Sequence, residues 1–318
     1  MEFEAFKNTI MDLVSKEVED RGLEGISMKL TTVESPDGMT DRLMVSVDDS
    51  KMSMAFRLKE IYQSVEDGED IDHAVYKMVN TIEDNISFVK EKEQDVKSFI
   101  SDYEKVKDNT YLRLIPGDSP ILKSTPHRMI EDMALVVNVH LDSFSDEHGK
   151  SCVVVTKPLM EMYGIDEAQL FADAEKNSLA NEPIVFTPLG DMIKNLIKAE
   201  NLPTPEEAGI ITYIASNRSG FQGAAVAGYP DFCKQAAEAI GGSFYMLPSS
   251  VHEFILIKDD GTPKAKDLNA MIRNVNETVL EPRDILASQC YHYDAKTKVL
   301  ETGLKYADKV QQRKGGAR

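Results

Sequence analysis

The sequence of 318 residues contains no tryptophan and only three cysteines, Cys152, Cys233 and Cys290. The three cysteines are far apart, and no two of them form a Cys-x-x-Cys pair. An odd number of cysteines without close spacing argues against a disulfide framework and against a zinc knuckle. We therefore expect neither structural disulfides nor a metal site.

Long apolar runs are also missing. No stretch approaches the ~20 consecutive apolar residues that a membrane-spanning helix needs. The first residues, MEFEAFKNTIMDL, carry acidic side chains where a secretion signal would carry basic ones. These two features predict a cytoplasmic protein without a membrane partner.

Positive charge is scarce as well. Lys and Arg number 36 against 54 Asp and Glu, so the formal net charge is −18. A chain with this charge repels phosphate backbones, and we expect no nucleic-acid partner. The one basic cluster, Arg313-Lys314 with Arg318, stands in a glycine-containing tail, which we interpret as a frayed terminus.

The common catalytic and nucleotide-binding motifs are absent too. There is no GxxxxGK[ST] phosphate loop and no GxSxG nucleophile elbow, and the glycines at 220, 223 and 228 lack the GxGxxG spacing. His252-Glu253 begins like the zinc motif HExxH, but Leu256 stands where the second histidine is required. No cofactor is therefore indicated.

What is present is an ordinary globular composition, with 42% apolar residues in a chain long enough for two domains. Residues 1–106 are expected to form a helix–hairpin–helix domain. Apolar residues recur at helical spacing over 3–20 and from 71 to 100. Between these helices, two alternating segments flank the turn sequence Ser35-Pro36-Asp37-Gly38, which predicts a hairpin.

Residues 107–305 predict a second domain, an antiparallel sheet with helices packed on it, followed by a flexible basic tail over 306–318. The fold class is thus α+β. The expected strands lie near 110–115, 135–141, 151–156, 210–215, 223–229, 244–247, 251–257, 290–293 and 298–302. The expected helices begin after Thr125-Pro126 and at Lys157-Pro158, and continue around 166–177, 188–200 and 230–240.

The segment Pro248 to Glu253 places a polar group between two apolar runs. Ser249 or Ser250 beside His252 is compatible with a nucleophile and its base. Residues 250 and 252 face the same way on a regular strand, but this spacing is unspecific. The alternative interpretation, which we favour, is a corner between two strands with a serine capping the turn. Glu253 is a further candidate for ligand binding.

A second polar segment runs from Asn217 to Gly223. Gly220 and Gly223 would allow the backbone to approach a ligand closely, and Arg218 could hold a carboxylate or a phosphate. The simpler interpretation is a hairpin loop, which needs Asn and Gly in any case.

Three weaker groups are better explained by structure than by function. His127-Arg128 with Glu131-Asp132 is typical of a first helical turn with surface charges. The acidic loop around His148 does not follow the ligand pattern of an EF-hand. Cys290 and His292 share one face of a strand and are expected to pack.

The segments PHRMIEDMALV from Pro126, ASNRSGFQGAA from Ala215 and FYMLPSSVHE from Phe244 together resemble domain-of-unknown-function family 5688. The similarity extends to LMEMYGI from Leu159 and YHYD from Tyr291. The resemblance implies an intracellular bacterial protein, since this family is common in anaerobic gut Firmicutes. It implies no activity.

Two hypotheses for function follow. The first is a non-catalytic module that binds a protein or small-molecule partner, because every strong catalytic motif is absent. The second is a hydrolase or transferase that uses His252 with Ser249 or Ser250, while Arg218 holds an anionic group. The second hypothesis requires the segments 217–223 and 248–252 to meet at one pocket.

Overall fold

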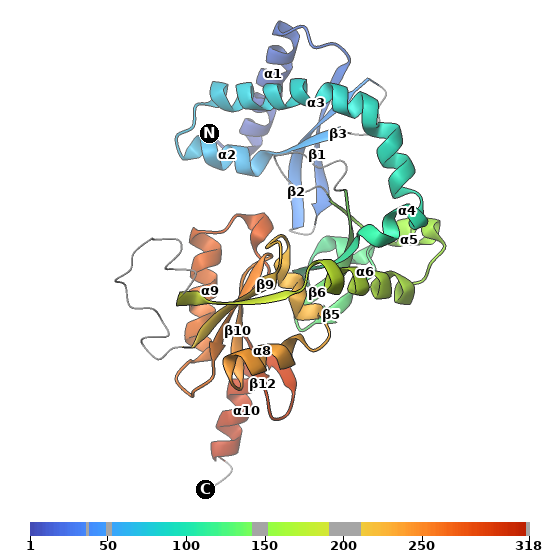
Figure 1. Cartoon of the computed structure of the whole chain (residues 1–318). Helices are drawn as coiled ribbons and strands as arrows, with labels where there is room; N and C mark the ends of the chain where they lie inside the picture. Colours follow the sequence, from blue (N-terminus) through green and yellow to red (C-terminus); the bar gives the residue numbers. More distant parts are fainter. Residues whose placement is uncertain (36–37, 49–52, 142–151, 191–210, 316–318) are drawn as a thin grey trace. The chain divides into compact units, whose positions relative to one another are not determined.

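The computed structural model describes residues 1–35, 38–48, 53–141, 152–190 and 211–315 (Figure 1). The chain divides into two compact units, Met1–Lys105 and Val106–Arg318. Helices and sheets occur in both units, and all strand pairings among the described residues are antiparallel. The fold class is α+β, as the sequence predicts.

The N-terminal unit contains a three-stranded sheet rather than a lone hairpin. Its elements are α1 (Phe3–Asp20), β1 (Ile26–Ser35), β2 (Gly38–Val47), β3 (Ser53–Arg57), α2 (Leu58–Glu66) and α3 (Ile71–Ile100). The strand order is β1-β2-β3. The sequence analysis missed β3 and α2. β3 has only five residues and runs directly into α2, so neither a loop nor a long alternating pattern marks it.

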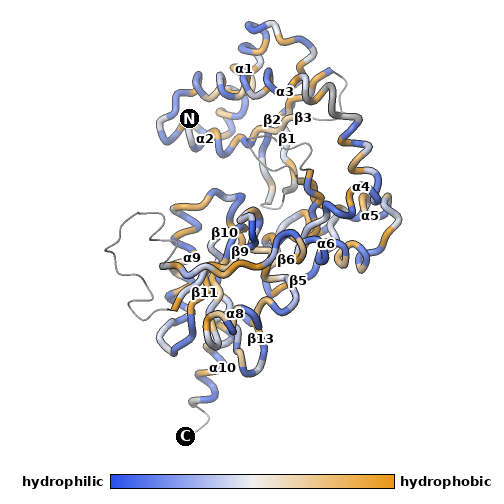
Figure 2. Tube along the Cα trace, viewed as in Figure 1, coloured by the Kyte–Doolittle hydropathy of each residue, from blue (hydrophilic) through white to orange (hydrophobic). Residues whose placement is uncertain are grey.

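One apolar cluster holds this unit together. The buried residues of α1 are Phe6, Ile10, Val14 and Val18, which recur every four positions and therefore lie on one face. They pack with Leu43 and Val45 of β2 and with a stripe on α3 that includes Val79 and Ile82. Apolar and polar residues alternate along both helices in Figure 2. Helical periodicity in the sequence thus identifies this core.

The C-terminal unit contains two antiparallel sheets, where the sequence predicted one. The six-stranded sheet has the order β13-β12-β10-β11-β9-β8. Its strands are β8 (Ile184–Pro188), β9 (Thr212–Asn217), β10 (Phe244–Ser250), β11 (Glu253–Lys258), β12 (Tyr291–Asp294) and β13 (Val299–Thr302). The smaller sheet joins β4 (Thr110–Pro116), β6 (Met133–His140), β5 (Arg128–Ile130) and β7 (Cys152–Val154) through β6.

Helices pack on both sheets. α6 (Glu167–Asn181) packs on the smaller sheet, and the six-stranded sheet carries α8 (Phe232–Ile240), α9 (Ala265–Thr278) and α10 (Gly303–Gly315). Two shorter helices are α4 (Tyr103–Val106) and α5 (Lys157–Tyr163). Buried polar side chains attach α6 to β4. The Ser178 hydroxyl accepts from the Leu112 N–H at 2.9 Å, and the Asn177 amide donates to the Thr110 carbonyl at 3.1 Å.

Residues 306–315 of the segment expected to be a flexible tail are part of α10. Tyr306 and Ala307 pack against a buried cluster that includes Tyr245 and Leu268. The sequence does not indicate this contact, because Tyr306 and Ala307 are apolar residues of a single helical turn within a mostly polar segment.

Two other local predictions are wrong. Thr125-Pro126 does not open a helix. The residues after it form β5, and the chain reverses at Glu131, whose φ is +53°. The strand expected over 223–229 is a 3₁₀ helix, η4 (Gly223–Gly228). The sequence analysis also missed β8, while most of the helix expected over 188–200 lies outside the described residues.

Candidate functional site

The segments 217–223 and 248–252 contact each other at the ends of neighbouring strands. Antiparallel pairing of β9 with β11 and of β10 with β11 places the two segments side by side. The Ser216 hydroxyl donates to the His252 carbonyl at 2.8 Å, and the Ala224 N–H donates to the Val251 carbonyl at 3.2 Å. Two regions that the sequence separates by about thirty residues thus form one structural unit.

His252 uses both of its ring nitrogens in this junction. Its Nδ1 accepts a hydrogen bond from the backbone N–H of Gln222 at 3.1 Å. In the neutral ring the proton is therefore assigned to Nε2. Nε2 lies 3.6 Å from a carboxylate oxygen of Asp284. The imidazole is 39% exposed, so it joins surface and backbone groups rather than filling a core.

The two serines have other partners. The hydroxyl of Ser250, a buried residue, accepts from the backbone N–H of His252 at 3.0 Å, an arrangement typical of a serine that stabilises a turn. The Ser249 hydroxyl donates to the Glu253 carboxylate at 3.2 Å. Among the described residues, neither hydroxyl bonds to the imidazole of His252. The geometry is that of a strand corner, with no nucleophile–base pair formed.

Hydrogen bonds of the Asn217 side chain hold the loop after β9 in place. The Asn217 amide donates to the Phe221 carbonyl at 3.0 Å and accepts from the Ser219 hydroxyl at 3.4 Å. The Arg218 side chain is exposed and makes no ion pair or hydrogen bond with another described residue. Arg218 remains a candidate for an anion contact, but the loop does not fix its position.

The two candidate glycines have different structural roles. Gly220 has φ +73° and open space where a Cβ would lie, so the turn alone requires glycine there. A Cβ on Gly223 would lie 2.5 Å from the His252 carbonyl oxygen and 2.9 Å from the Asn217 nitrogen. Gly223 therefore allows η4 to pack against the two strands. This close approach of backbones explains why glycine stands at residue 223 without requiring a ligand.

Next to this junction lies a group of polar side chains that the sequence does not single out, which we call the Cys152 cluster. It consists of buried Asn138, His140 and Gln222 and the partly buried Cys152. The Asn138 amide donates to Gln222 Oε1 at 3.1 Å, and both amides contact Cys152 Sγ. The available signal was the pair Asn138 and His140 on one face of an otherwise apolar strand.

The members of the other polar groups that the sequence predicted do not hydrogen-bond to one another in the described residues; each has a different partner. His127 contacts the Thr125 carbonyl, whereas the Arg128 guanidinium lies over the ring of Phe171 at 4.2 Å. The acidic loop around His148 lies outside the described residues. Cys290 and His292 also have separate partners. The Cys290 thiol contacts the Ala265 carbonyl, and His292 Nε2 lies 2.9 Å from an Asp259 oxygen.

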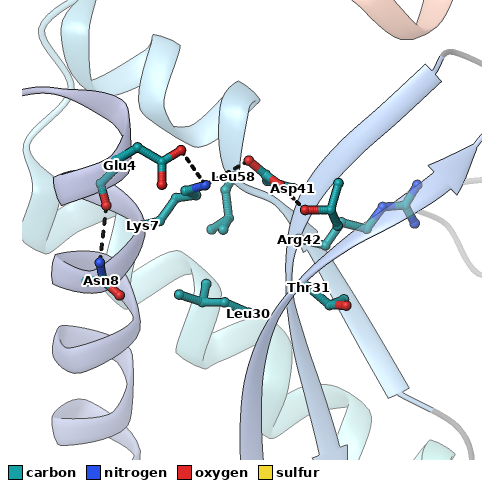
Figure 3. A pocket seen from close by; sticks show the side chains of 9 residues that line it. Glu4, Lys7, Asn8, Leu30, Thr31, Asp41, Arg42 and Leu58 are labelled. Atoms are coloured by element: carbon teal, nitrogen blue, oxygen red, sulfur yellow. Dashed lines mark hydrogen bonds and ion pairs between the residues drawn. The ribbon is translucent and has the colours of Figure 1, made fainter.

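A polar cavity of about 370 Å³ lies in the N-terminal unit, between α1, β1, β2 and the start of α2 (Figure 3). We call it the Lys7 pocket. Its lining residues are Glu4, Lys7, Asn8, Leu30, Thr31, Thr32, Asp41, Arg42 and Leu58. The sequence analysis did not predict it, because its residues come from four elements and match no motif.

Lys7 is the centre of charge in this pocket. Its ammonium lies 2.7 Å from a Glu4 oxygen and 2.9 Å from an Asp41 oxygen. The hydrogen bonds that Lys7 donates to Glu4 and, next in size, to Asp41 raise the pKa of Lys7. Hydrogen bonds from Thr32 and then Lys7 lower the pKa of Asp41. The pocket therefore places the carboxyl groups of Glu4 and Asp41 around the ammonium of Lys7.

Within the part of the chain that the structure describes, no group of three or more His, Cys, Asp or Glu side chains has the arrangement of a metal site. No helix there is long and apolar enough to cross a bilayer.

Comparison with known proteins gives one match. No curated protein and no solved structure matches this chain. The model of a family of unknown function, DUF5688, matches residues 3–295. This range includes the Lys7 pocket, the junction at His252 and the Cys152 cluster. The chain belongs to the family of unknown function DUF5688.

Proposed function

We propose that this protein is a cytoplasmic binding module of Firmicutes whose Lys7 pocket takes a small organic amine. The observation that carries the proposal is the arrangement of two carboxylates, from Glu4 and Asp41, around the single ammonium of Lys7. The resemblance of several sequence segments to family DUF5688 supports the bacterial part of the proposal.

The charges favour a cation over an anion. The Arg42 guanidinium points away from Lys7 in Figure 3, and its Nε donates to the Thr40 hydroxyl at 3.1 Å. Glu4 is 82% exposed and can accept further hydrogen bonds from an incoming ammonium group. The net charge of −18 also raises the local concentration of cations.

The shape of the pocket fits a short ligand with an apolar part. Its volume lies at the lower end of the range typical of small-molecule sites. The partly buried Leu30 offers an apolar surface for methylene groups next to the charged residues. An alkylamine satisfies both requirements.

Isothermal titration calorimetry with ethylamine, ethanolamine and 1,4-diaminobutane tests the proposal, with acetate and phosphate as anionic probes. We expect heat of binding with the amines only. Asp41→Asn should weaken binding about tenfold, because it removes a charged hydrogen-bond acceptor. Glu24→Gln, which removes an exposed carboxylate outside the pocket, is the matched control. Binding of the anions instead, or equal amine binding by Asp41→Asn, would show that the proposal is wrong.

The alternative is a hydrolase or transferase centred on His252. It is favoured by the contact between the segments 217–223 and 248–252. It is disfavoured by the partners of Ser249 and Ser250, neither of which bonds to the imidazole among the described residues. Hydrolysis of p-nitrophenyl acetate that is lost in His252→Ala, with an unchanged unfolding transition, would favour this alternative over the binding module.

A further inference from the structure

Cys152 lies beside His140 in the smaller sheet of the C-terminal unit. The two residues are directly opposite each other in the antiparallel pairing of β6 with β7. Opposite residues in such a pair point to the same face, with Cβ atoms about 4.5–5.5 Å apart. Asn138 precedes His140 by two positions and shares this face. The sheet therefore brings a thiol, an imidazole and an amide together.

The sulfur of Cys152 accepts hydrogen bonds from two side-chain amides. Asn138 Nδ2 lies 3.3 Å and Gln222 Nε2 lies 3.5 Å from Sγ. Gln222 is held by its own backbone, since its N–H donates to His252 Nδ1 at 3.1 Å. Amide donors bond more strongly to a thiolate than to a thiol, because the bond is then charge-assisted. Both side-chain amide donors are thus aimed at the sulfur of Cys152.

A second and independent observation points to a missing hydrogen-bond donor. Asn138 is fully buried, and its Oδ1 has no hydrogen-bond partner among the described residues. A buried, unpaired carbonyl oxygen is costly and is normally matched by a donor. This oxygen belongs to the same amide whose nitrogen contacts Cys152 Sγ. A hydroxyl group attached to the sulfur would supply the donor that Oδ1 lacks.

The other two cysteines offer a contrast within the same chain. Burial raises the pKa of the Cys233 thiol and of the Cys290 thiol to about 11. Both therefore stay protonated near neutral pH. Cys152 and Cys233 are partly buried, whereas Cys290 is buried, so a small molecule can reach Cys152.

We propose that Cys152 is the reactive thiol of this protein and that its substrate is a small hydroperoxide, which oxidises it to a sulfenic acid. The thiolate attacks one peroxide oxygen, so an S–O bond forms and the O–O bond breaks. The departing hydroxide or alkoxide takes up the proton that the thiol released. Sulfur is oxidised, the peroxide is reduced, and the products are Cys–SOH and water or an alcohol.

The position of the donors selects this chemistry over acyl transfer. Asn138 Nδ2 and Gln222 Nε2 point to the sulfur itself. An acyl-transfer site needs donors where the oxygen of a tetrahedral intermediate would lie. Aromatic rings also flank the cluster. The ring centre of His140 lies 4.3 Å from that of Tyr111, on which it stacks, and 6.0 Å from that of Phe221, which it meets edge-on. Bulky side chains on this side favour a small oxidant.

The test uses the reduced full-length protein, hydrogen peroxide as the oxidant and dimedone to trap sulfenic acid. Mass spectrometry then measures the rate of adduct formation at each cysteine, and Cys152→Ser confirms the assignment. We expect adducts at Cys152 well before Cys233 or Cys290, and faster than with free glutathione at the same pH. Reaction of Cys152 at or below the rate of glutathione would overturn the proposal without any variant.

Two isosteric variants test the cause of the reactivity. Asn138→Asp and Gln222→Glu each replace one donor by a carboxylate oxygen, and each should slow adduct formation about tenfold. Asn274→Asp adds the same charge on the exposed surface of α9 and should leave the rate unchanged. A rate that all three variants leave equal to that of the wild type would mean that the amides do not activate Cys152.

Discussion

The backbone N–H of Gln222 donates a 3.1 Å hydrogen bond to the imidazole Nδ1 of His252, and this bond joins the loop after β9 to the turn between β10 and β11. The same residue Gln222 extends its side chain in the other direction, to Asn138 and Cys152. His252 therefore holds the backbone that presents Gln222 to the Cys152 cluster. Removal of the imidazole should affect both the stability of the junction and the geometry of the cluster.

His252→Ala should lower the free energy of unfolding by about 1–2 kcal/mol, because the N–H of Gln222 loses its acceptor. Urea denaturation followed by circular dichroism measures this change. Arg218→Ala is the matched control, since its exposed side chain makes no hydrogen bond or ion pair with another described residue, and we expect no change in stability. Equal unfolding midpoints for His252→Ala and the wild type would contradict the structural role of the imidazole.

Gly223→Ala should be far more disruptive than Gly220→Ala. A Cβ at residue 223 collides with the backbone of His252 and of Asn217, so the cost is about 3 kcal/mol. At residue 220 only the positive φ opposes alanine, which costs about 1 kcal/mol. Thermal unfolding of the two variants side by side measures the difference. A Gly223→Ala variant as stable as Gly220→Ala would show that the strands can separate easily to admit the methyl group.

The sequence predicts helices well where one face stays apolar over several turns. α1 is an example, because Phe6, Ile10, Val14 and Val18 are spaced by one helical turn and all four are buried. Prediction fails where contacts between distant segments decide the structure. The residues after Pro126 pair with β6 instead of forming a helix, and Gly223 begins a 3₁₀ helix because its backbone packs against His252.

The candidate sites show the same limit. The sequence identified the polar segments 217–223 and 248–253, because each of them interrupts an apolar run. It did not identify the partner of the imidazole, since hydrogen bonds across about thirty residues of sequence leave no spacing pattern. Cys152 and Asn138 were missed as a pair for this reason. The Lys7 pocket was missed because ion pairs between a helix and a strand depend on how the two pack.

A buried tyrosine links the two sheets of the C-terminal unit. The hydroxyl of Tyr291, on β12, donates to an oxygen of Asp132 in the turn between β5 and β6. Gln289 donates to the other oxygen of that carboxylate at 2.7 Å. Tyr291→Phe keeps the ring and removes only the donor, so we expect a loss of about 1.5 kcal/mol in urea unfolding.

The control for Tyr291→Phe is Gln289→Ala, which removes the other donor to Asp132 from a more exposed position. We expect a smaller loss, since water replaces an exposed hydrogen bond at little cost. If Gln289→Ala proved the more damaging of the two variants, the buried hydroxyl would not be the main link between the sheets.

A buried histidine, His292, is placed to make stability depend on pH. Its imidazole is 1% exposed and lies flat on the ring of Tyr306, with 3.4 Å between ring centres. Nε2 lies 2.9 Å from an Asp259 oxygen, and Nδ1 is buried with no hydrogen-bond partner in the described part of the chain. Burial lowers the pKa of His292, while Asp259, and less strongly Asp294 and Glu301, act in the opposite direction.

Because the pKa of His292 is lower in the folded state than its ordinary value of 6.5, the unfolded chain binds a proton that the folded protein does not. Above about pH 7 both states are neutral at this residue, and it adds no pH dependence. As the pH falls below about 6.5, this difference in proton binding destabilises the fold until the lowered pKa is reached. Urea unfolding between about pH 7.5 and about pH 5 should therefore show a loss of stability that His292→Gln reduces. His127→Gln, which removes a histidine outside this contact, should leave the slope as it is in the wild type. An equal slope for His292→Gln and the wild type would mean that other groups cause the loss.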